Sequence, residues 1–147
     1  ASEYYLATQN YYEFCREINV LINQYPFVKE YYSFAVEQLL FAKRFDDVYP
    51  FLVKGYKRYP QALYAKWIGI IDLSKEKVDS AIFYLNESIK LSSSDAQVHF
   101  NLAGAYIKKK MFNEALNSIN NCLAVNPNYP DANRLKGQLG QITKVNR

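Results

Sequence analysis

The sequence has few of the residues from which active sites are built. It holds one histidine, two cysteines and five glycines in 147 residues. It contains no Cys-x-x-Cys, His-Glu-x-x-His or Gly-x-Ser-x-Gly motif, and no glycine-rich loop suited to a phosphate group. The acids Asp46 and Asp47 open an expected helix, where carboxylates cap free amides. We therefore expect no catalytic residue, no metal and no cofactor, and the chain is not expected to be an enzyme.

Targeting and membrane-spanning segments are also missing from the sequence. No apolar run approaches the roughly 20 residues needed to cross a bilayer. No charged-then-apolar signal segment is visible, and the chain begins with Ala-Ser rather than Met. We expect a domain excised from a longer parent, whose compartment the sequence leaves open.

The chain has only a small excess of charge. The formal net charge is +4, and residues 1–73 hold eight acidic and eight basic residues, so the excess lies in residues 74–147. Its densest piece, Lys108–Lys110, falls at the end of an expected helix, where cations complement the helix dipole. No interleaving of arginine with aromatic residues accompanies it. The pattern favours a solvated helix end and no nucleic-acid partner.

The clearest pattern in the sequence is a pair of amphipathic helices within Ala96–Tyr129. Apolar residues recur three and four positions apart in both halves of this stretch. They are Val98, Leu102, Ala105 and Tyr106 in the first half, and Phe112, Ala115, Leu116, Ile119 and Leu123 in the second. A polar turn at Lys108–Lys110 separates the helices, and Pro127 follows the second. The stretch is therefore predicted to form a helical hairpin.

This hairpin resembles a tetratricopeptide repeat (TPR). The places of the family pattern are filled by His99, Leu102, Ala103, Tyr106, Ala115, Ile119, Cys122 and Pro127. His99 then stands at a packing position, so we expect a core histidine rather than a catalytic one. A single repeat cannot bury its apolar faces alone, which implies neighbouring repeats.

Two earlier stretches match the same pattern less fully. Residues 62–95 carry Ile68-Gly69, Ala81, Leu85 and Ser88 in the corresponding places, but Asp72 replaces the tyrosine and Ser93 replaces the proline. The run at 92–95 is expected to cap the next helix through its Ser and Asp side chains. Residues 29–61 end in Tyr59-Pro60, in a register that the sequence defines only to within one residue.

The two ends of the chain are expected to hold single helices. Residues 3–28 form an N-terminal helix or partial repeat. Residues 130–147 form a polar capping helix with Leu135, Leu139 and Ile142 on one face, or else the first helix of a further repeat. The resemblance implies one all-α domain over residues 1–147, a right-handed α-α superhelix (TPR solenoid) of antiparallel helix pairs. Cys15 and Cys122 would lie in different repeats as core thiols that cannot form a disulfide.

The resemblance also implies a non-catalytic protein–protein interaction or scaffold module. Such domains bind a peptide or helix of a protein partner in a concave groove lined by the first helix of each repeat. The candidate groove residues are Lys66, Ile70, Leu73, Phe100, Asn101, Gly104, Ile107 and Arg134. Phe100 beside Gly104 would form a shallow apolar site, and Lys66 and Arg134 could hold an acidic group. Alternatively, the aliphatic members of the set only pack between repeats.

One TPR subclass is excluded by its residue pattern. TPR domains that bind the acidic C-terminal tails of chaperones use a clamp of five Lys and Asn places. Lys66 and Asn101 match two of them, but Ile70 stands where an Asn is required. Asp131 and Leu135 replace the two basic residues of the third helix. Without those donors a carboxylate would not be held tightly.

Two alternatives to a free interaction module stay open. The chain could be an accessory domain of a larger enzyme or envelope protein, with its groove packed on the parent chain. It could also self-associate as a weak homodimer through the partial repeat at 3–28, whose apolar face lacks its usual cover.

Overall fold

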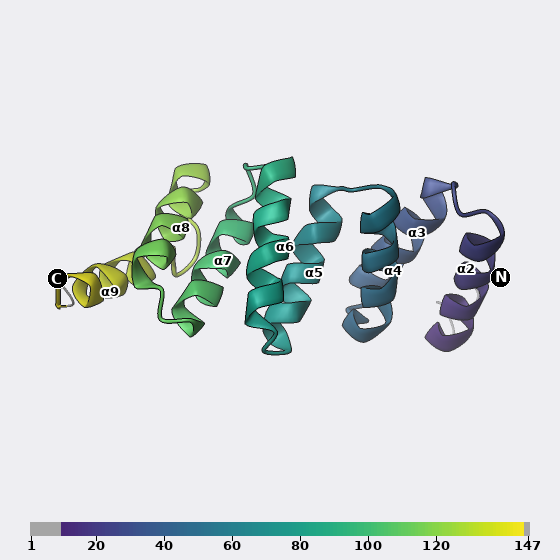
Figure 1. Ribbon diagram of the computed structural model, residues 1–147, viewed down its shortest axis with the longest axis horizontal. Coiled ribbons are helices and arrows are strands. Elements are labelled where there is room, and N and C mark those ends of the chain that lie inside the picture. Colours follow the sequence, from purple (N-terminus) through teal and green to yellow (C-terminus); the bar gives the residue numbers. More distant parts are fainter. Residues whose placement is uncertain (1–9, 146–147) are drawn as a thin grey trace. The chain divides into compact units, whose positions relative to one another are not determined.

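The computed structural model describes residues 10–145, and the described part is helical without any strand (Figure 1). Its helices are α2 (Tyr11–Gln24), α3 (Lys29–Phe41), α4 (Phe45–Arg58), α5 (Ala62–Ser74), α6 (Val78–Leu91), α7 (Ala96–Lys108), α8 (Phe112–Val125) and α9 (Ala132–Val145). The predicted all-α class of paired helices is confirmed. Residues 3–9 of the expected N-terminal helix lie outside the described residues.

The chain divides into two compact units, residues 1–60 and residues 61–147. The division falls after Pro60, one residue before the predicted repeat boundary between residues 61 and 62. The single domain expected over the whole chain stays a prediction.

In the first unit, α3 packs against both α2 and α4. Its core consists of aromatic and aliphatic side chains at helical spacing, which are Phe14, Ile18, Ile22, Tyr32, Val36, Leu39, Val48, Phe51 and Leu52. Two hydrogen bonds from tyrosine hydroxyls tie the turn between α2 and α3 to the neighbouring helices. Tyr32 donates to the Pro26 carbonyl oxygen at 2.9 Å, and Tyr59 donates to the Phe27 carbonyl oxygen at 2.6 Å.

In the second unit, each helix from α5 to α9 packs against the next one along the chain. The α5–α6 and α6–α7 contacts enclose Leu85, Val98 and Leu102. The α7–α8 and α8–α9 contacts enclose a cluster of Ala103, Ala115, Ile119 and Leu139. Small residues at these crossings let the helix backbones approach closely, as the sequence predicts. Helix α9 turns Leu139 inward and its polar residues outward.

The same turn connects the two helices of each pair. Lys43, Glu76 and Lys110 each adopt a positive φ, at 56°, 60° and 59°. In all three turns the following amide donates to a carbonyl five residues earlier: Arg44 to Leu39, Lys77 to Asp72, and Met111 to Tyr106. This is the hydrogen-bond pattern of a helix C-terminus closed by a left-handed residue. The repeated turn aligns the three pairs and defines the register of residues 29–61.

Departures from the repeat pattern have local explanations. Asp72, at the place of the pattern's tyrosine, is buried, and its carboxylate accepts a hydrogen bond from the Ser80 hydroxyl. Asp95 caps α7, and its Oδ1 accepts from the Gln97 amide at 3.0 Å. The capping role expected for the 92–95 run is therefore confirmed at Asp95. Both cysteines are free thiols, Cys122 buried and Cys15 half-buried.

Candidate partner-binding surface

One stripe of α5 carries three of the candidate groove residues. Lys66, Ile70 and Leu73 are spaced four and three residues apart, so they lie on one side of the helix. All three are half-buried, whereas the opposite side of α5 is buried at Ala65 and Ile68. This stripe is therefore more accessible than the buried side of α5, and its role in binding stays a prediction.

The matching stripe of α7 carries four more candidates. Phe100, Gly104 and Ile107 follow the same spacing, and Asn101 lies beside them. All four are half-buried, and a Cβ atom added to Gly104 would meet no atom within 4 Å. Helices α5 and α7 contact each other directly. We call these seven residues, from Lys66 to Ile107, the α5/α7 surface.

The apolar members of this surface also pack against the core. Ile70 contacts the cluster of Leu85, Val98 and Leu102, and Phe100 and Ile107 contact the cluster around Ala103. The packing role that the sequence leaves open is thus present for Ile70 and Ile107. Because both side chains stay partly exposed, packing inside the unit does not use all of their surface.

The ring of Tyr129 contacts the ring of Phe100, and the helical spacing of the sequence does not predict this contact. The two rings lie 5.0 Å apart between centroids with planes inclined by 39°. Burial raises the pKa of the Tyr129 hydroxyl, with smaller contributions from the Cys122 thiol and the Asp95 carboxylate. Tyr129 precedes α9, so only the path of the α8–α9 connection brings it over α7. It extends the apolar part of the α5/α7 surface.

Lys66 is already paired within the chain. Its Nζ lies 2.8 Å from Asp95 Oδ2, and only 14% of its side chain is exposed. Because Asp95 also caps α7, this ion pair links α5 to the start of α7. The Asn101 amide nitrogen likewise donates to the Gln97 carbonyl oxygen, at 2.8 Å. The two donors that match the chaperone clamp are therefore engaged inside the unit.

Arg134 forms an exposed ion pair. Its guanidinium lies 3.0 Å from Asp131 Oδ1, with 72% of the Arg134 side chain and 64% of the Asp131 side chain exposed. Pairs of this kind contribute little to stability. Arg134 can therefore exchange Asp131 for an acidic group of a partner at small cost.

The described residues offer little for catalysis. No group of three or more His, Cys, Asp or Glu side chains in residues 10–145 could hold a metal ion. His99 is buried, as predicted, and its Nε2 lies 2.9 Å from the Ser93 carbonyl oxygen. That oxygen only accepts, so Nε2 carries the proton, while Nδ1 has no hydrogen-bond partner. No described helix is long and apolar enough to cross a membrane.

Comparison with known families identifies the second half of the chain. Residues 72–139 match the family described as tetratricopeptide repeat. This region is a tetratricopeptide repeat. The TPR pattern residues Leu102, Ala103, Ala115, Ile119 and Cys122 are all buried, as the family register requires. No curated protein sequence matches the chain.

Solved structures also share this fold. A crystal structure of MamA aligns with this chain at a TM-score of 0.81 and 14% sequence identity. The alignment covers 98% of this chain and 85% of the MamA chain. YrrB is described as a TPR protein with an unusual peptide-binding site, and its structure aligns at a TM-score of 0.76 and 13% sequence identity. The alignment covers 97% of this chain and 74% of the YrrB chain. The first TPR of Spaghetti (RPAP3), bound to the HSP90 peptide SRMEEVD, aligns at a TM-score of 0.67 and 15% sequence identity. The alignment covers 74% of this chain and 87% of the RPAP3 chain. Identities this low show the fold alone.

Proposed function

We propose that this chain is a non-catalytic interaction module whose α5/α7 surface binds a peptide segment or short helix of a protein partner. The observation that carries the proposal is the pair of half-buried apolar stripes on two adjacent TPR first helices, with an open position at Gly104. An extended or helical segment could place an apolar side chain over Gly104, between Phe100 and Ile107.

The structural relatives support this class of function. YrrB is described with a peptide-binding site, and the RPAP3 domain is bound to a peptide. The RPAP3 peptide, SRMEEVD, carries three acidic side chains. Here Lys66 is paired with Asp95, and Ile70 stands at a clamp place. We therefore propose a ligand for the α5/α7 surface that binds mainly through apolar side chains.

A matched pair of glycine variants tests the site. Gly104→Trp would fill the open position between Phe100 and Ile107, and Gly137→Trp would add the same side chain to α9 outside the candidate set. A Cβ atom at either glycine meets nothing within 4 Å, so both variants should fold. Affinity capture from a lysate of source cells compares them with the unmodified chain.

A protein retained by the unmodified chain and Gly137→Trp but lost with Gly104→Trp would support the α5/α7 surface. A protein retained equally by all three would place recognition elsewhere. If none retains a protein and light scattering shows a dimer, self-association replaces the proposal.

A further inference from the structure

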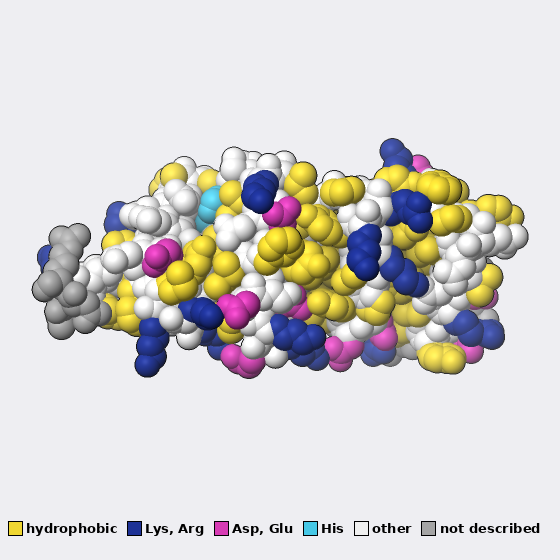
Figure 2. Space-filling model, in the orientation of Figure 1, with side chains coloured by type: hydrophobic (Ala, Val, Ile, Leu, Met, Phe, Trp, Pro, Cys, Tyr) yellow, Lys and Arg dark blue, Asp and Glu magenta, His cyan; other side chains and the backbone are white. Residues whose placement is uncertain are grey.

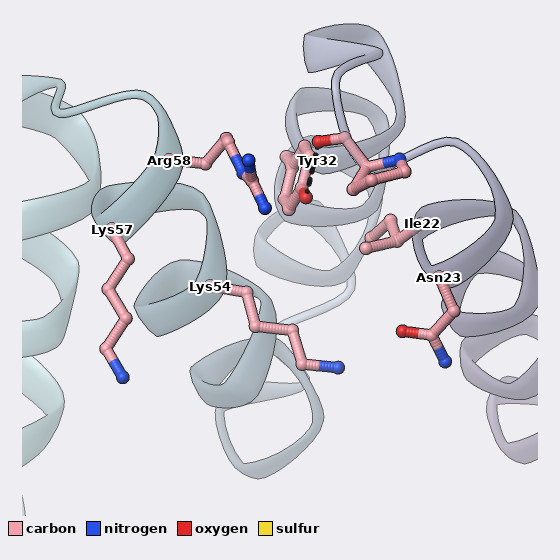
Figure 3. A pocket seen from close by; sticks show the side chains of 7 residues that line it. Ile22, Asn23, Tyr32, Lys54, Lys57 and Arg58 are labelled. Carbon is pink, nitrogen blue, oxygen red and sulfur yellow. Dashed lines mark hydrogen bonds between the residues drawn. The ribbon is translucent and has the colours of Figure 1, made fainter.

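The first unit contains a pocket of about 440 Å³ that the groove assignment does not include (Figure 3). Its lining residues come from α2, the following turn, α3 and α4, and are Ile22, Asn23, Pro26, Tyr32, Lys54, Lys57 and Arg58. Ile22 and Tyr32 are buried and form an apolar floor, while Asn23 and the three cations are exposed. In Figure 3, Lys54 and Arg58 extend from α4 toward the Tyr32 and Asn23 side of the opening. The volume lies in the range of small-ligand sites.

Two of the three cations of this pocket contact neutral groups. Lys54 Nζ donates to Asn19 Oδ1 at 3.1 Å, and the Arg58 guanidinium lies 4.5 Å from the centroid of the Phe27 ring. Among the described residues, none of the three forms an ion pair with a carboxylate. The sequence has no acidic residue from 48 to 71 or from 18 to 29. Figure 2 shows the resulting gathering of Lys and Arg side chains over α4.

Two lysines in the densest basic run of the second unit do form ion pairs with carboxylates. Lys108–Lys110 is the densest basic run in the sequence, but Lys108 pairs with Glu76 at 3.0 Å and Lys109 with Asp79 at 2.8 Å. Local acids therefore neutralise most of that run. The α4 pocket, by contrast, keeps its positive charge without described acidic partners.

Helix dipoles do not balance the charge of the pocket. Lys57 and Arg58 lie in the last turn of α4, where cations complement the dipole. Each helix end carries only about half an elementary charge. The C-termini of α2 and α4 and the N-terminus of α3 meet near the pocket, so their sum is about −0.5. Three full positive charges exceed this several-fold, and a net positive potential remains in the opening.

We propose that the α4 pocket binds an acidic peptide segment, with carboxylates on Lys54, Lys57 and Arg58 and one apolar side chain on the Ile22–Tyr32 floor. Arginine suits this role because its planar guanidinium binds a carboxylate through two parallel hydrogen bonds. Asn23 can donate to a peptide carbonyl group. A nucleic acid strand instead requires a longer groove of cations that follows its backbone. This site lies in the first unit, apart from the residues proposed to bind a partner on α5 and α7.

Fluorescence anisotropy with the full chain tests the proposal. The probe is a fluorescein-labelled peptide of sequence Glu-Asp-Glu-Leu-Asp-Glu, and its control replaces every acid by the corresponding amide. We expect the acidic probe to bind, the amide control to bind at least about tenfold more weakly, and added salt to weaken the acidic probe. Equal binding of the two peptides, or no binding of the acidic one, would overturn the proposal.

Two matched triple variants separate the pocket from general charge. One carries Lys54→Gln, Lys57→Gln and Arg58→Gln; the other carries Lys108→Gln, Lys109→Gln and Lys110→Gln, with the same change in net charge. The first should weaken binding about tenfold or more and the second less than about twofold. Equal losses would show non-specific attraction.

A third variant tests the pocket without changing charge. Asn23→Trp places a large side chain at the exposed rim and should also weaken the acidic probe, whereas Gly137→Trp, on α9 and outside both proposed sites, should not. Circular dichroism confirms that each variant is folded. A short oligo(dT) serves as a second probe. If it binds more tightly than the peptide and loses affinity in the α4 triple variant, the pocket is reassigned to nucleic acid. Unchanged affinity in Asn23→Trp would place the probe outside the pocket.

Discussion

A Cβ atom at Gly69 would lie 2.7 Å from Leu85 Cγ, closer than real side chains approach. The same atom would lie 3.2 Å from the Ala81 carbonyl oxygen, which belongs to the backbone of α6. Gly69 therefore sets the distance at which α5 crosses α6. The corresponding place in the next helix pair holds Ala103, which is also fully buried. Close helix crossings are thus a shared requirement of both pairs.

Gly69→Ala should destabilise the chain although alanine favours helices. Overpacking costs about 1–3 kcal/mol, and the gain in helix propensity is about 1 kcal/mol. Gly104 lies in the equivalent helix of the next pair, and a Cβ atom there would meet no atom within 4 Å. Gly104→Ala should therefore stabilise the folded chain by about 0.5–1 kcal/mol. Urea denaturation of both variants measures the difference. Changes of the same sign would contradict the described α5–α6 crossing.

Lys110→Gly should raise the melting temperature by a few degrees. Lys110 adopts a φ of 59°, a left-handed conformation that glycine takes without steric cost. The expected gain is about 0.5–1 kcal/mol, because the strain relieved exceeds the added entropy of the unfolded chain. Thermal unfolding followed by circular dichroism provides the measurement. A lower melting temperature would mean that the lysine side chain contributes more than its backbone costs.

Asp95→Ala should cost more stability than Asp95→Asn. The alanine variant loses the cap on α7, worth about 0.5–2 kcal/mol, and leaves Lys66 without its partner. Asparagine keeps the acceptor oxygen of the cap and loses only the charge. Chemical denaturation of the two variants, with Lys66→Met in both backgrounds, separates the cap from the ion pair. Equal losses in both Asp95 variants would show that the cap contributes little.

Alkylation of Cys15 should be slow at mildly alkaline pH. Burial, followed by the charge of Asp47, raises the pKa of the Cys15 thiol to about 11, with Arg44 opposing. In a Cys122→Ala background, the rate with iodoacetamide should still rise about tenfold per pH unit through pH 10, because only the thiolate reacts. In denaturant the rate should level off above a pKa of about 9. A plateau near pH 9 in the folded chain would contradict the described environment.

The same shift has a consequence for stability. The folded chain holds the Cys15 proton more tightly than the unfolded chain, so the unfolded state loses its proton first as pH rises. The stabilisation is therefore present below the unfolded pKa and is lost as the pH rises toward about 11. Cys15→Ser should remove this part of the alkaline loss.

Periodic features of the fold can be predicted from the sequence because they depend on local spacing. The apolar stripes at 98–106 and 112–123 predict the α7–α8 pair, and the acid at 95 predicts its cap. The side of each helix that carries Lys66 or Phe100 follows from the same spacing. The register of residues 29–61 required the backbone, because the first helix there carries Ala35-Val36 in place of the Leu-small pair of the pattern. The left-handed residue Lys43 then aligns this pair with the turns at Glu76 and Lys110.

Contacts between distant side chains could not be predicted in this way. The Lys66–Asp95 ion pair and the Phe100–Tyr129 contact depend on how neighbouring helices and loops are placed. The pairing of charged side chains could not be predicted either. Lys108 appears free in the sequence but pairs with Glu76, 32 residues away. The sequence alone does not mark a cluster at Lys54, Lys57 and Arg58. The cluster becomes visible only around the pocket between α2 and α4.

Site-specific photo-crosslinking tests the central claim, that a partner binds over α5 and α7, most directly. A photoreactive phenylalanine derivative replaces Gly104 in one variant and Gly137 in the other, both at positions where an added side chain meets open space. Illumination in source cells, followed by purification of the chain, shows which position reacts. We expect a covalent adduct with a partner protein at position 104 and none at position 137. Adducts at position 137 alone, or equal adducts at both positions, would contradict it.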